Sequence, residues 1–123
     1  MYKTIIIDDE PKCTESLLYV LKKNCPAIDV VATAVSGEEG YEKILQHNPD
    51  IIFLDVEMPH KNGFDFLTAS KEPGFDVIFT TAYNQYAIQA IRFSALDYLL
   101  KPIDPDELKA AVMRHIEKKD AVH

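Results

Sequence analysis

The sequence is poor in cysteine, and this scarcity argues against a disulfide-stabilised fold. Cys13 and Cys25 are the only cysteines among its 123 residues. If both lie on one helix, 12 residues at a rise of about 1.5 Å each place them roughly 18 Å apart, too far for a disulfide. A chain of this length buries enough surface to fold as one domain without a disulfide or a structural metal.

Long apolar runs are also missing. No stretch of the sequence approaches the roughly 20 consecutive apolar residues that a membrane-spanning helix requires. Residues 1–4 lead directly into a short apolar run, without the longer apolar core and small-residue cleavage site of a signal peptide. We therefore expect a cytoplasmic protein that does not associate with a membrane.

Positive charge is in short supply, because 13 Lys and Arg residues stand against 20 Asp and Glu residues, for a formal net charge of −7. This balance argues against direct binding of a nucleic-acid phosphate backbone by the chain itself. Contact with DNA would therefore need a separate domain. Hydrophobic residues at 47% and charged residues at 27% are typical of a soluble globular domain.

Short apolar runs alternate with longer amphipathic stretches along the whole chain. The apolar runs predict strands at residues 5–7, 30–32, 51–54, 77–79 and 98–100. The amphipathic stretches predict helices at residues 11–24, 36–45, 63–70, 84–93 and 105–116. Such an alternation predicts an α/β fold of three layers, in which helices cover both faces of a parallel sheet.

Polar side chains follow the predicted strands at the points where they end. Ligands of parallel α/β sheets bind beyond the carboxyl ends of the strands, where the strand order reverses. The residues at these ends are Asp8, Asp9, Asp55, Thr80, Thr81 and Lys101. Three gathered carboxylates repel one another unless a proton or a cation neutralises them, and a set of oxygen ligands suits Mg²⁺. We interpret the three aspartates as a Mg²⁺ site rather than as unrelated helix-capping acids.

Thr81 and Lys101 add hydrogen-bond donors to this cluster. The Thr81 hydroxyl could donate to a phosphoryl oxygen, although capping the next helix is the simpler role for a lone threonine. Lys101 could bridge to a carboxylate or a phosphoryl group in the same pocket. Its peptide bond to Pro102 is a candidate for the cis form, which would direct the amine into the pocket.

In this order, Asp8-Asp9, Asp55, Thr81 and Lys101-Pro102 resemble the receiver domain of bacterial two-component response regulators. The intervals are similar too, with 46 residues from Asp9 to Asp55, 26 more to Thr81 and 20 more to Lys101. The resemblance covers nearly the whole chain, so we interpret residues 1–123 as one receiver domain. It implies a flavodoxin-like (CheY-like) (βα)5 fold with the parallel strand order 2-1-3-4-5.

The resemblance also implies the chemistry of the aspartates. Asp55 would accept a phosphoryl group from a phosphohistidine on a sensor histidine kinase. The Mg²⁺ ligands would be Asp9, Asp55 and the backbone carbonyl of Glu57, with Asp8 acting through a water molecule. By the same resemblance, the chain is a phosphoacceptor in signalling rather than an enzyme that turns over a separate substrate.

The donors and one aromatic residue receive roles from the resemblance as well. Thr81 and Lys101 would contact the phosphoryl group and take part in catalysis, and Tyr98 would act with Thr81 as a switch. Glu57 and Tyr83 occupy positions that vary among receivers and influence how long the phosphoryl group survives. Glu57 could position or repel an attacking water, and Tyr83 could shield the site; the sequence leaves both alternatives open.

Three segments carry a narrower resemblance, to receivers of the LytTR (LytR/AlgR) class. They are residues 53–59, which include Met58-Pro59, residues 81–83 and residues 95–102. In that class the receiver precedes a β-rich DNA-binding domain that regulates transcription. The natural protein is either longer than this chain or a single-domain regulator. The intact start and the charged end of the chain favour the longer protein, so we expect DNA contact only through an output domain outside this chain.

The helix predicted at residues 84–93 carries more apolar residues than one packed face can hold. Its polar stripe consists of Gln85, Gln89 and Arg92, and most of its other residues are apolar. Either neighbouring loops cover the excess apolar surface or it stays exposed for a partner. We hypothesise a homodimer, strengthened by phosphorylation, through the face formed by this helix, the strand at 98–100 and the last helix.

Two alternatives remain open on the sequence alone. Asp55-Val56-Glu57 resembles the Asp-x-Asp motif of Mg²⁺-dependent phosphotransfer or nucleotidyl-transfer enzymes of the haloacid dehalogenase or TOPRIM type, although Glu replaces the second Asp. The small size and the Lys101-Pro102 element count against these enzymes. The second alternative is a pseudo-receiver that binds partners without phosphorylation, and the complete set of Asp, Thr and Lys argues against it.

Overall fold

A computed structural model of the chain describes residues 1–58, 62–69 and 74–120. Its strands are β1 (Tyr2–Ile7), β2 (Ile28–Ala34), β3 (Ile51–Asp55), β4 (Asp76–Thr81) and β5 (Asp97–Leu100). Its helices are α1 (Pro11–Asn24), α2 (Gly37–His47), α3 (Gly63–Ala69), α4 (Ala87–Arg92) and α5 (Pro105–Asp120), with a 3₁₀ turn, η1 (Asn84–Tyr86), before α4. Pro59, in the segment 53–59 that carries the narrower resemblance, and Ser70, the predicted end of a helix, lie outside the described residues.

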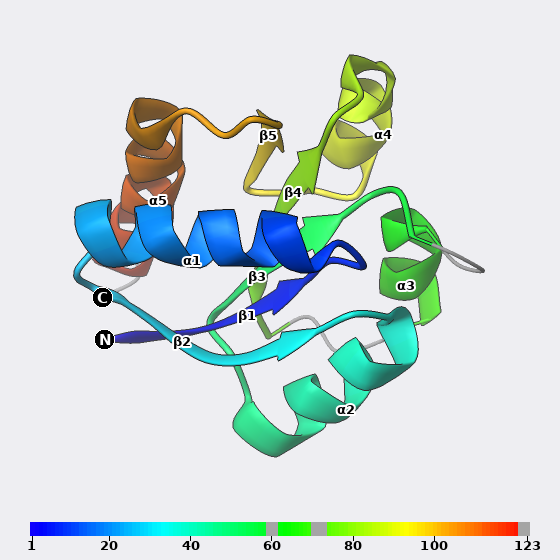
Figure 1. The fold of residues 1–123 in the computed structure, drawn as a ribbon, viewed down its shortest axis with the longest axis horizontal. Helices are drawn as coiled ribbons and strands as arrows, with labels where there is room; N and C mark the ends of the chain where they lie inside the picture. Colours follow the sequence, from blue (N-terminus) through cyan, green and yellow to red (C-terminus); the bar gives the residue numbers. More distant parts are fainter. Residues whose placement is uncertain (59–61, 70–73, 121–123) are drawn as a thin grey trace.

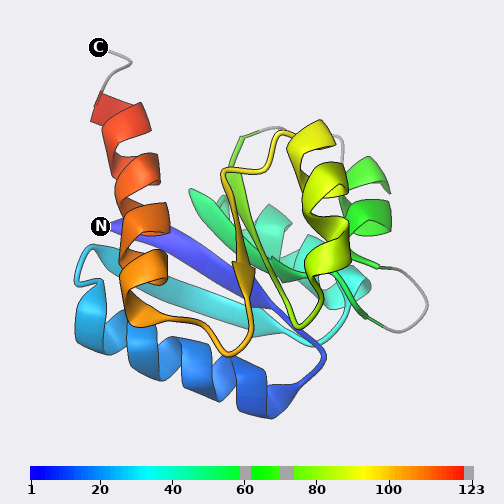
Figure 2. The same ribbon diagram turned by 90° about the horizontal axis from the view of Figure 1, so that it is seen from above.

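The strands form one parallel sheet in the order β2-β1-β3-β4-β5, which confirms the predicted α/β topology. Figure 1 shows α1 and α5 on one face of this sheet, and Figure 2 shows α2, α3 and α4 together on the other face. The chain passes from β1 to β2 on one side and then crosses to β3 on the other, so the strand order reverses between β1 and β3. The residues that follow these two strands therefore lie at the switch point.

The hydrophobic core is divided by the sheet into two clusters. Ile5 and Ile7 pack with residues of α2, α3 and α4, whereas Ile6 packs with residues of α1 and α5. This alternation follows from the two-residue period of a strand, which sends successive side chains to opposite faces. All five residues of β3 are buried, as expected for a central strand covered on both faces.

Local sequence signals position the ends of most helices. Pro11 occupies the first turn of α1, and Ser36 caps α2 by accepting a hydrogen bond from the backbone amide of Glu39 at 3.2 Å. Asp104 caps α5 in the same way, accepting from the amide of Glu107 at 3.0 Å. These signals confirm the predicted starts of all three helices.

The fourth helix differs from its prediction. A single helix was predicted at residues 84–93, but the structure has the 3₁₀ turn η1 followed by the shorter α4. The amide of Ala87 donates to the carbonyl of Asn84, so the first turn is tightened to the i→i+3 pattern. Tyr86, at the junction, packs its ring beside Phe64 and binds Glu57 through its hydroxyl, and these tertiary contacts accompany the change in backbone.

Within the described residues, no helix combines the length and the apolar composition needed to cross a membrane. Cys13 lies in α1 and Cys25 directly follows it, and both thiols are free, as the sequence predicted.

Candidate functional site

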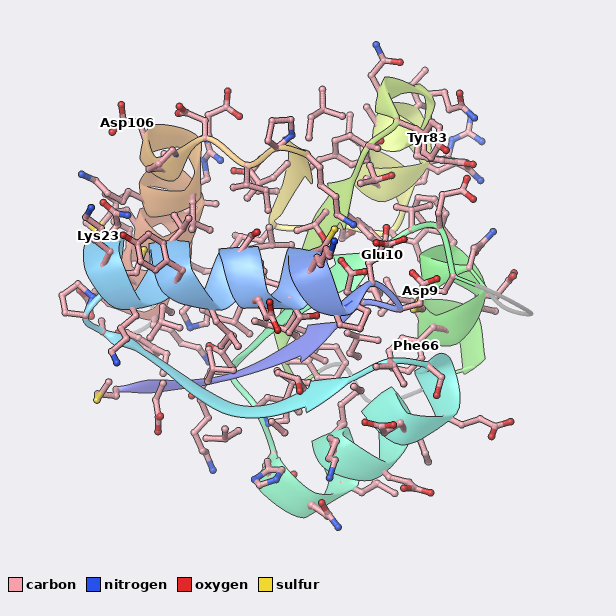
Figure 3. All side chains as sticks on the ribbon, in the orientation of Figure 1. Asp9, Glu10, Lys23, Phe66, Tyr83 and Asp106 are labelled. Atoms are coloured by element: carbon pink, nitrogen blue, oxygen red, sulfur yellow. The ribbon has the colours of Figure 1, made fainter. Side chains whose placement is uncertain are left out.

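The sheet brings the predicted site residues together at the carboxyl ends of β1, β3 and β4. Ile7 of β1 pairs with Leu54 of β3, so Asp8 and Asp55 come next on neighbouring strands. Asp55 in turn pairs with Thr80 of β4, which places Thr81 one residue farther along. Figure 3 shows Asp9, Glu10 and Tyr83 toward the same end of the molecule, with Lys23 toward the other.

A cavity of about 490 Å³ opens at this edge of the sheet. The predicted site residues that line it are Asp9, Asp55, Glu57, Thr81 and Lys101, together with Tyr83. Glu10 and Cys13 line it as well, and the sequence analysis did not assign them to the site. Their position follows from the entry of the chain into α1, which begins at Pro11 directly after the strand-end acids. Proximity to the Asp8-Asp9 pair was therefore the available signal.

Three carboxylates and one ammonium group form the centre of this site. One oxygen each from Asp8, Asp9 and Asp55 lies within 4.8 Å of the others. Lys101 Nζ donates to Asp8 Oδ2 at 2.8 Å and to Asp55 Oδ2 at 3.4 Å. Asp8 and Asp55 are buried and Asp9 is half-buried, so two of these charges are removed from water. One ammonium group cannot neutralise three carboxylates, and the excess negative charge favours the binding of a cation.

Backbone amides fix the orientation of both buried carboxylates. Asp8 Oδ1 accepts a hydrogen bond from the amide of Glu10 at 2.9 Å, and Asp55 Oδ1 accepts one from the amide of Glu57 at 3.2 Å. In each case the donor lies two residues after the acid, the local turn that aspartate favours. The second oxygen of each carboxylate faces Lys101. Asp8 and Asp55 therefore present equivalent edges to one amine.

This environment changes the acidity of the site. Burial raises the pKa of Asp55 to about 6, since the repulsion from Asp8 adds to it and the attraction of Lys101 only partly offsets it. Burial opposes the charge on Lys101, but the hydrogen bond to Asp8 and the attraction of Asp55 outweigh it and raise the pKa of the amine. Lys101 is therefore a permanent cation beside a carboxylate that is costly to ionise.

Thr81 is fully buried beside this cluster. Its hydroxyl oxygen accepts a hydrogen bond from the amide of Tyr83 at 3.3 Å, which leaves the hydroxyl hydrogen available to a ligand. Its backbone carbonyl accepts a hydrogen bond from the amide of Lys101 at 2.8 Å, and this bond holds the backbone of Lys101 next to the site. The Lys101–Pro102 peptide bond is cis.

Tyr83 lines the cavity, and Tyr86 and Tyr98 are linked to lining residues by hydrogen bonds. The Tyr86 hydroxyl donates to Glu57 Oε1, and the Tyr98 hydroxyl donates to the backbone carbonyl of Tyr83. The hydrogen bond with Glu57 raises the pKa of Tyr86. Tyr98 is half-buried and contacts the rim through Tyr83 rather than lining the cavity itself. Sequence reasoning missed Tyr86, because 29 residues separate it from Glu57 and no local pattern links them.

Gly63 allows the start of α3 to lie close to the end of β3. Its amide donates to the carbonyl of Val56 at 2.8 Å. A Cβ at this position would lie 2.7 Å from the backbone oxygen of Asp55 and 3.2 Å from Cα of Val56. Because both atoms belong to the backbone, a larger residue would displace the end of β3 next to the carboxylate.

Comparisons with known proteins identify relatives of this chain. The family model of the response regulator receiver domain matches residues 4–113. An uncharacterized response regulatory protein of Vibrio vulnificus is 42% identical over 115 residues, which are 93% of this chain and 47% of that protein. The sensory transduction protein LytT of Bacillus subtilis is 34% identical over 118 residues, which are 94% of this chain and 48% of that protein.

A solved structure is similar over almost its whole length. The REC domain of AraT, a response regulator from Geobacillus stearothermophilus, is 36% identical with a TM-score of 0.86, and the match covers 98% of this chain and 96% of that one. In contrast, the chain spans about half the length of the curated relatives that it matches.

Proposed function

The chain belongs to the response regulator receiver domain family, and we propose that its Asp55 accepts a phosphoryl group from a phosphohistidine of a sensor histidine kinase. One observation carries the proposal: a buried carboxylate lies in a cavity with a permanent ammonium group, further acids and a hydroxyl donor. Phosphoryl transfer needs chiefly positioning and charge neutralisation, and this set supplies both.

Each of three side chains, Asp55, Lys101 and Thr81, would have a separate role in the transfer. An oxygen of Asp55 forms a bond to phosphorus while the bond from phosphorus to the kinase histidine nitrogen breaks. Lys101 stabilises the charge on the transferring oxygens, and the free hydroxyl hydrogen of Thr81 donates to one of them. Asp55 therefore starts as a carboxylate held by Lys101 and ends as an acyl phosphate, with Lys101 and Thr81 as its partners.

The acidic cluster fits Mg²⁺. Asp8, Asp9 and Asp55 offer oxygen ligands within 4.8 Å of one another, and their charge exceeds that of the single lysine. We propose that Asp9, Asp55 and the backbone carbonyl of Glu57 bind the ion, with Asp8 acting through a water molecule. Bound Mg²⁺ would neutralise part of the charge on the phosphoryl oxygens.

The added charge on Asp55 is proposed to act on the loop between β4 and α4. The Thr81 hydroxyl bonds the amide of Tyr83, and the Tyr83 carbonyl bonds the hydroxyl of Tyr98. If Thr81 binds a phosphoryl group, a change in its hydrogen bond to Tyr83 would be transmitted to Tyr98 through Tyr83 alone. We assign Thr81 and Tyr98 as the switch that transmits phosphorylation to α4 and β5.

We also propose that the chain is part of a longer protein with an output domain. The chain spans about half of relatives such as the sensory transduction protein LytT, which supports a LytTR-type DNA-binding output domain after residue 123. With a net charge of −7, the receiver would leave DNA contact to that domain. Transcription would then be regulated in the cytoplasm by the phosphorylation state of Asp55.

A homodimer through α4, β5 and α5 would connect phosphorylation to output. Ile88 and Ile91 of α4 are 68% and 75% exposed, and Leu100 of β5 is 42% exposed. Large apolar side chains this exposed on two elements in contact with each other favour a partner. Of the two alternatives that the sequence left open for this helix, the exposed fractions of Ile88 and Ile91 favour an apolar surface that is not covered by loops.

Mass spectrometry of the intact protein tests the acceptor directly. After incubation with acetyl phosphate and Mg²⁺, the wild type is expected to gain one phosphoryl group, and Asp55→Asn is expected to gain none. Asp29→Asn, which removes an exposed acid from β2, serves as the matched control and should be phosphorylated like the wild type.

The two alternatives to this function have their own outcomes. A folded wild type that gains no mass would favour a pseudo-receiver. Phosphorylation that persists in Asp55→Asn would mean that the acceptor assignment is wrong. Turnover of a generic phosphate ester would instead point to a phosphotransfer enzyme, whereas a receiver is expected only to phosphorylate and dephosphorylate itself.

A further inference from the structure

We propose that Tyr86 is a positioning residue that holds the Glu57 carboxylate at the rim of the cavity and so lengthens the lifetime of the phosphoryl group on Asp55. The inference rests on the proposed function, because it concerns the loss of the group that Asp55 would accept. It assigns a role to the hydroxyl of Tyr86, a side chain outside the cavity lining.

The backbone of Glu57 lies next to Asp55, the proposed phosphoryl acceptor. Its amide donates to Asp55 Oδ1 at 3.2 Å, and the residue lines the same cavity as Asp55. The side chain itself is exposed, so packing does not hold it in one orientation. Within the described residues, the Tyr86 hydroxyl is the side-chain partner of this carboxylate. The position of the Glu57 charge relative to Asp55 therefore depends on Tyr86.

Tyr86 is itself held by aromatic packing. Its ring centroid lies 6.0 Å from that of Phe64 and 6.3 Å from that of Tyr83, the latter in an edge-to-face arrangement. Phe64 is buried and packs in turn against Phe79 of β4 at 4.8 Å. The hydroxyl thus extends from a ring fixed to the core, and it can restrain a flexible side chain.

The chemistry of phosphoryl loss gives this restraint a consequence. A water oxygen forms a bond to phosphorus, the bond from phosphorus to Asp55 breaks, and the water proton passes to a base; the products are the Asp55 carboxylate and inorganic phosphate. A free carboxylate two residues from the acceptor is such a base. The hydrogen bond from Tyr86 occupies one oxygen of Glu57 and ties the carboxylate to the ring of Tyr86, so the carboxylate is less free to reach a water molecule at Asp55.

The test measures the rate at which phosphorylated protein loses its phosphoryl group after acetyl phosphate is removed by gel filtration. Tyr86→Phe keeps the ring and deletes only the hydroxyl, and we expect loss to become about fivefold faster, the effect of one ordinary hydrogen bond. In a Glu57→Ala background the same change should leave the rate unaltered. Tyr41→Phe, which deletes an exposed hydroxyl on α2, is the matched control and should behave as the wild type.

Two results would overturn the inference. One is an unchanged rate in Tyr86→Phe, and the other is an equal acceleration in the Glu57→Ala background, which would mean that Tyr86 acts without Glu57. If the wild type takes up no phosphoryl group, the proposed function fails first and the inference falls with it, an outcome that the mass measurement identifies separately.

A second measurement examines the contact without any phosphoryl group. In protein labelled with ¹³C at Cζ of tyrosine, the Tyr86 signal is identified by its disappearance in Tyr86→Phe. At neutral pH this signal is expected to shift in Glu57→Ala, because the hydroxyl loses its acceptor. An unshifted signal would contradict the contact on which the inference depends.

Discussion

The fold holds Asp55 in an environment that disfavours the ionised form of its side chain. Burial raises its pKa from 3.8 to about 6, and Lys101 compensates only in part, because Asp8 shares the same amine. Between these two values the folded protein binds more protons at this residue than the unfolded chain does. Stability must therefore fall as the pH rises from about 4 to about 6. The site that we propose for a phosphoryl group and a cation thus carries a cost to stability.

Asp55→Asn is expected to stabilise the protein at pH 7 in buffer containing EDTA, by on the order of 1–3 kcal/mol, because it removes the buried charge and keeps the shape of the side chain. The gain should shrink toward zero as the pH falls to about 4, where the wild-type carboxyl is protonated. Urea unfolding across this range measures the difference. Asp29→Asn should show no such gain, and an Asp55→Asn variant that is less stable at pH 7 would contradict the argument.

At the scale of elements, an acid at the start of β4 connects the sheet to α5. Asp76 Oδ2 lies 2.6 Å from Nδ1 of His115, and Lys118 Nζ donates to Asp76 Oδ1 at 2.6 Å. His115 is fully buried, and the ring of Tyr2 packs edge-on against it at 4.9 Å. Burial of Asp76 opposes its charge, but the hydrogen bonds from Lys118 and His115 outweigh this effect and lower its pKa.

Asp76→Asn is expected to destabilise the protein at pH 7 by about 1–2 kcal/mol, since it weakens two hydrogen bonds from α5. Because the folded pKa of Asp76 lies below its unfolded value, the advantage of the wild type is complete above about pH 4 and is lost as the pH falls through the folded pKa. Urea unfolding of both proteins at neutral and acidic pH measures this. Asp106→Asn, which removes an exposed acid from the first turn of α5, is the control. An equal difference at every pH would contradict the role of the charge.

Elements and strand ends were predictable from the sequence, whereas contacts between distant residues were not. The alternation of apolar runs predicted the strands and, apart from the first turn of the fourth helix, the helices of the described residues, because period and capping signals are local. Asp8, Asp55 and Lys101 could be brought together because the topology rule places strand ends at one edge. The contact of Asp76 with His115 spans 39 residues, and neither residue carries a signal for the other. The 3₁₀ turn before α4 escaped prediction for the same reason, since its contacts are tertiary.

At the scale of the whole molecule, the proposed phosphorylation site and the exposed apolar face lie on connected parts of the chain. Thr81 and Tyr83 line the cavity, and the segment that follows them leads through η1 into α4. Ile88 and Ile91 remain exposed on α4, while Ala90 is buried against the sheet. A movement of the loop after β4 would therefore reposition the face that we propose for dimerisation. The acidic site and the proposed partner surface would thereby be coupled through one short segment.

Sedimentation velocity with and without acetyl phosphate and Mg²⁺ tests this coupling. The phosphorylated wild type is expected to sediment as a dimer, and Ile91→Glu is expected to remain a monomer although it still gains its phosphoryl group, because a charge cannot be buried in an apolar interface without a partner. Leu45→Glu places the same charge at a side chain of α2 that is 59% exposed and should dimerise like the wild type. A wild type that sediments as the same monomer in both states would remove the dimer, and dimerisation of Ile91→Glu would move the interface away from α4.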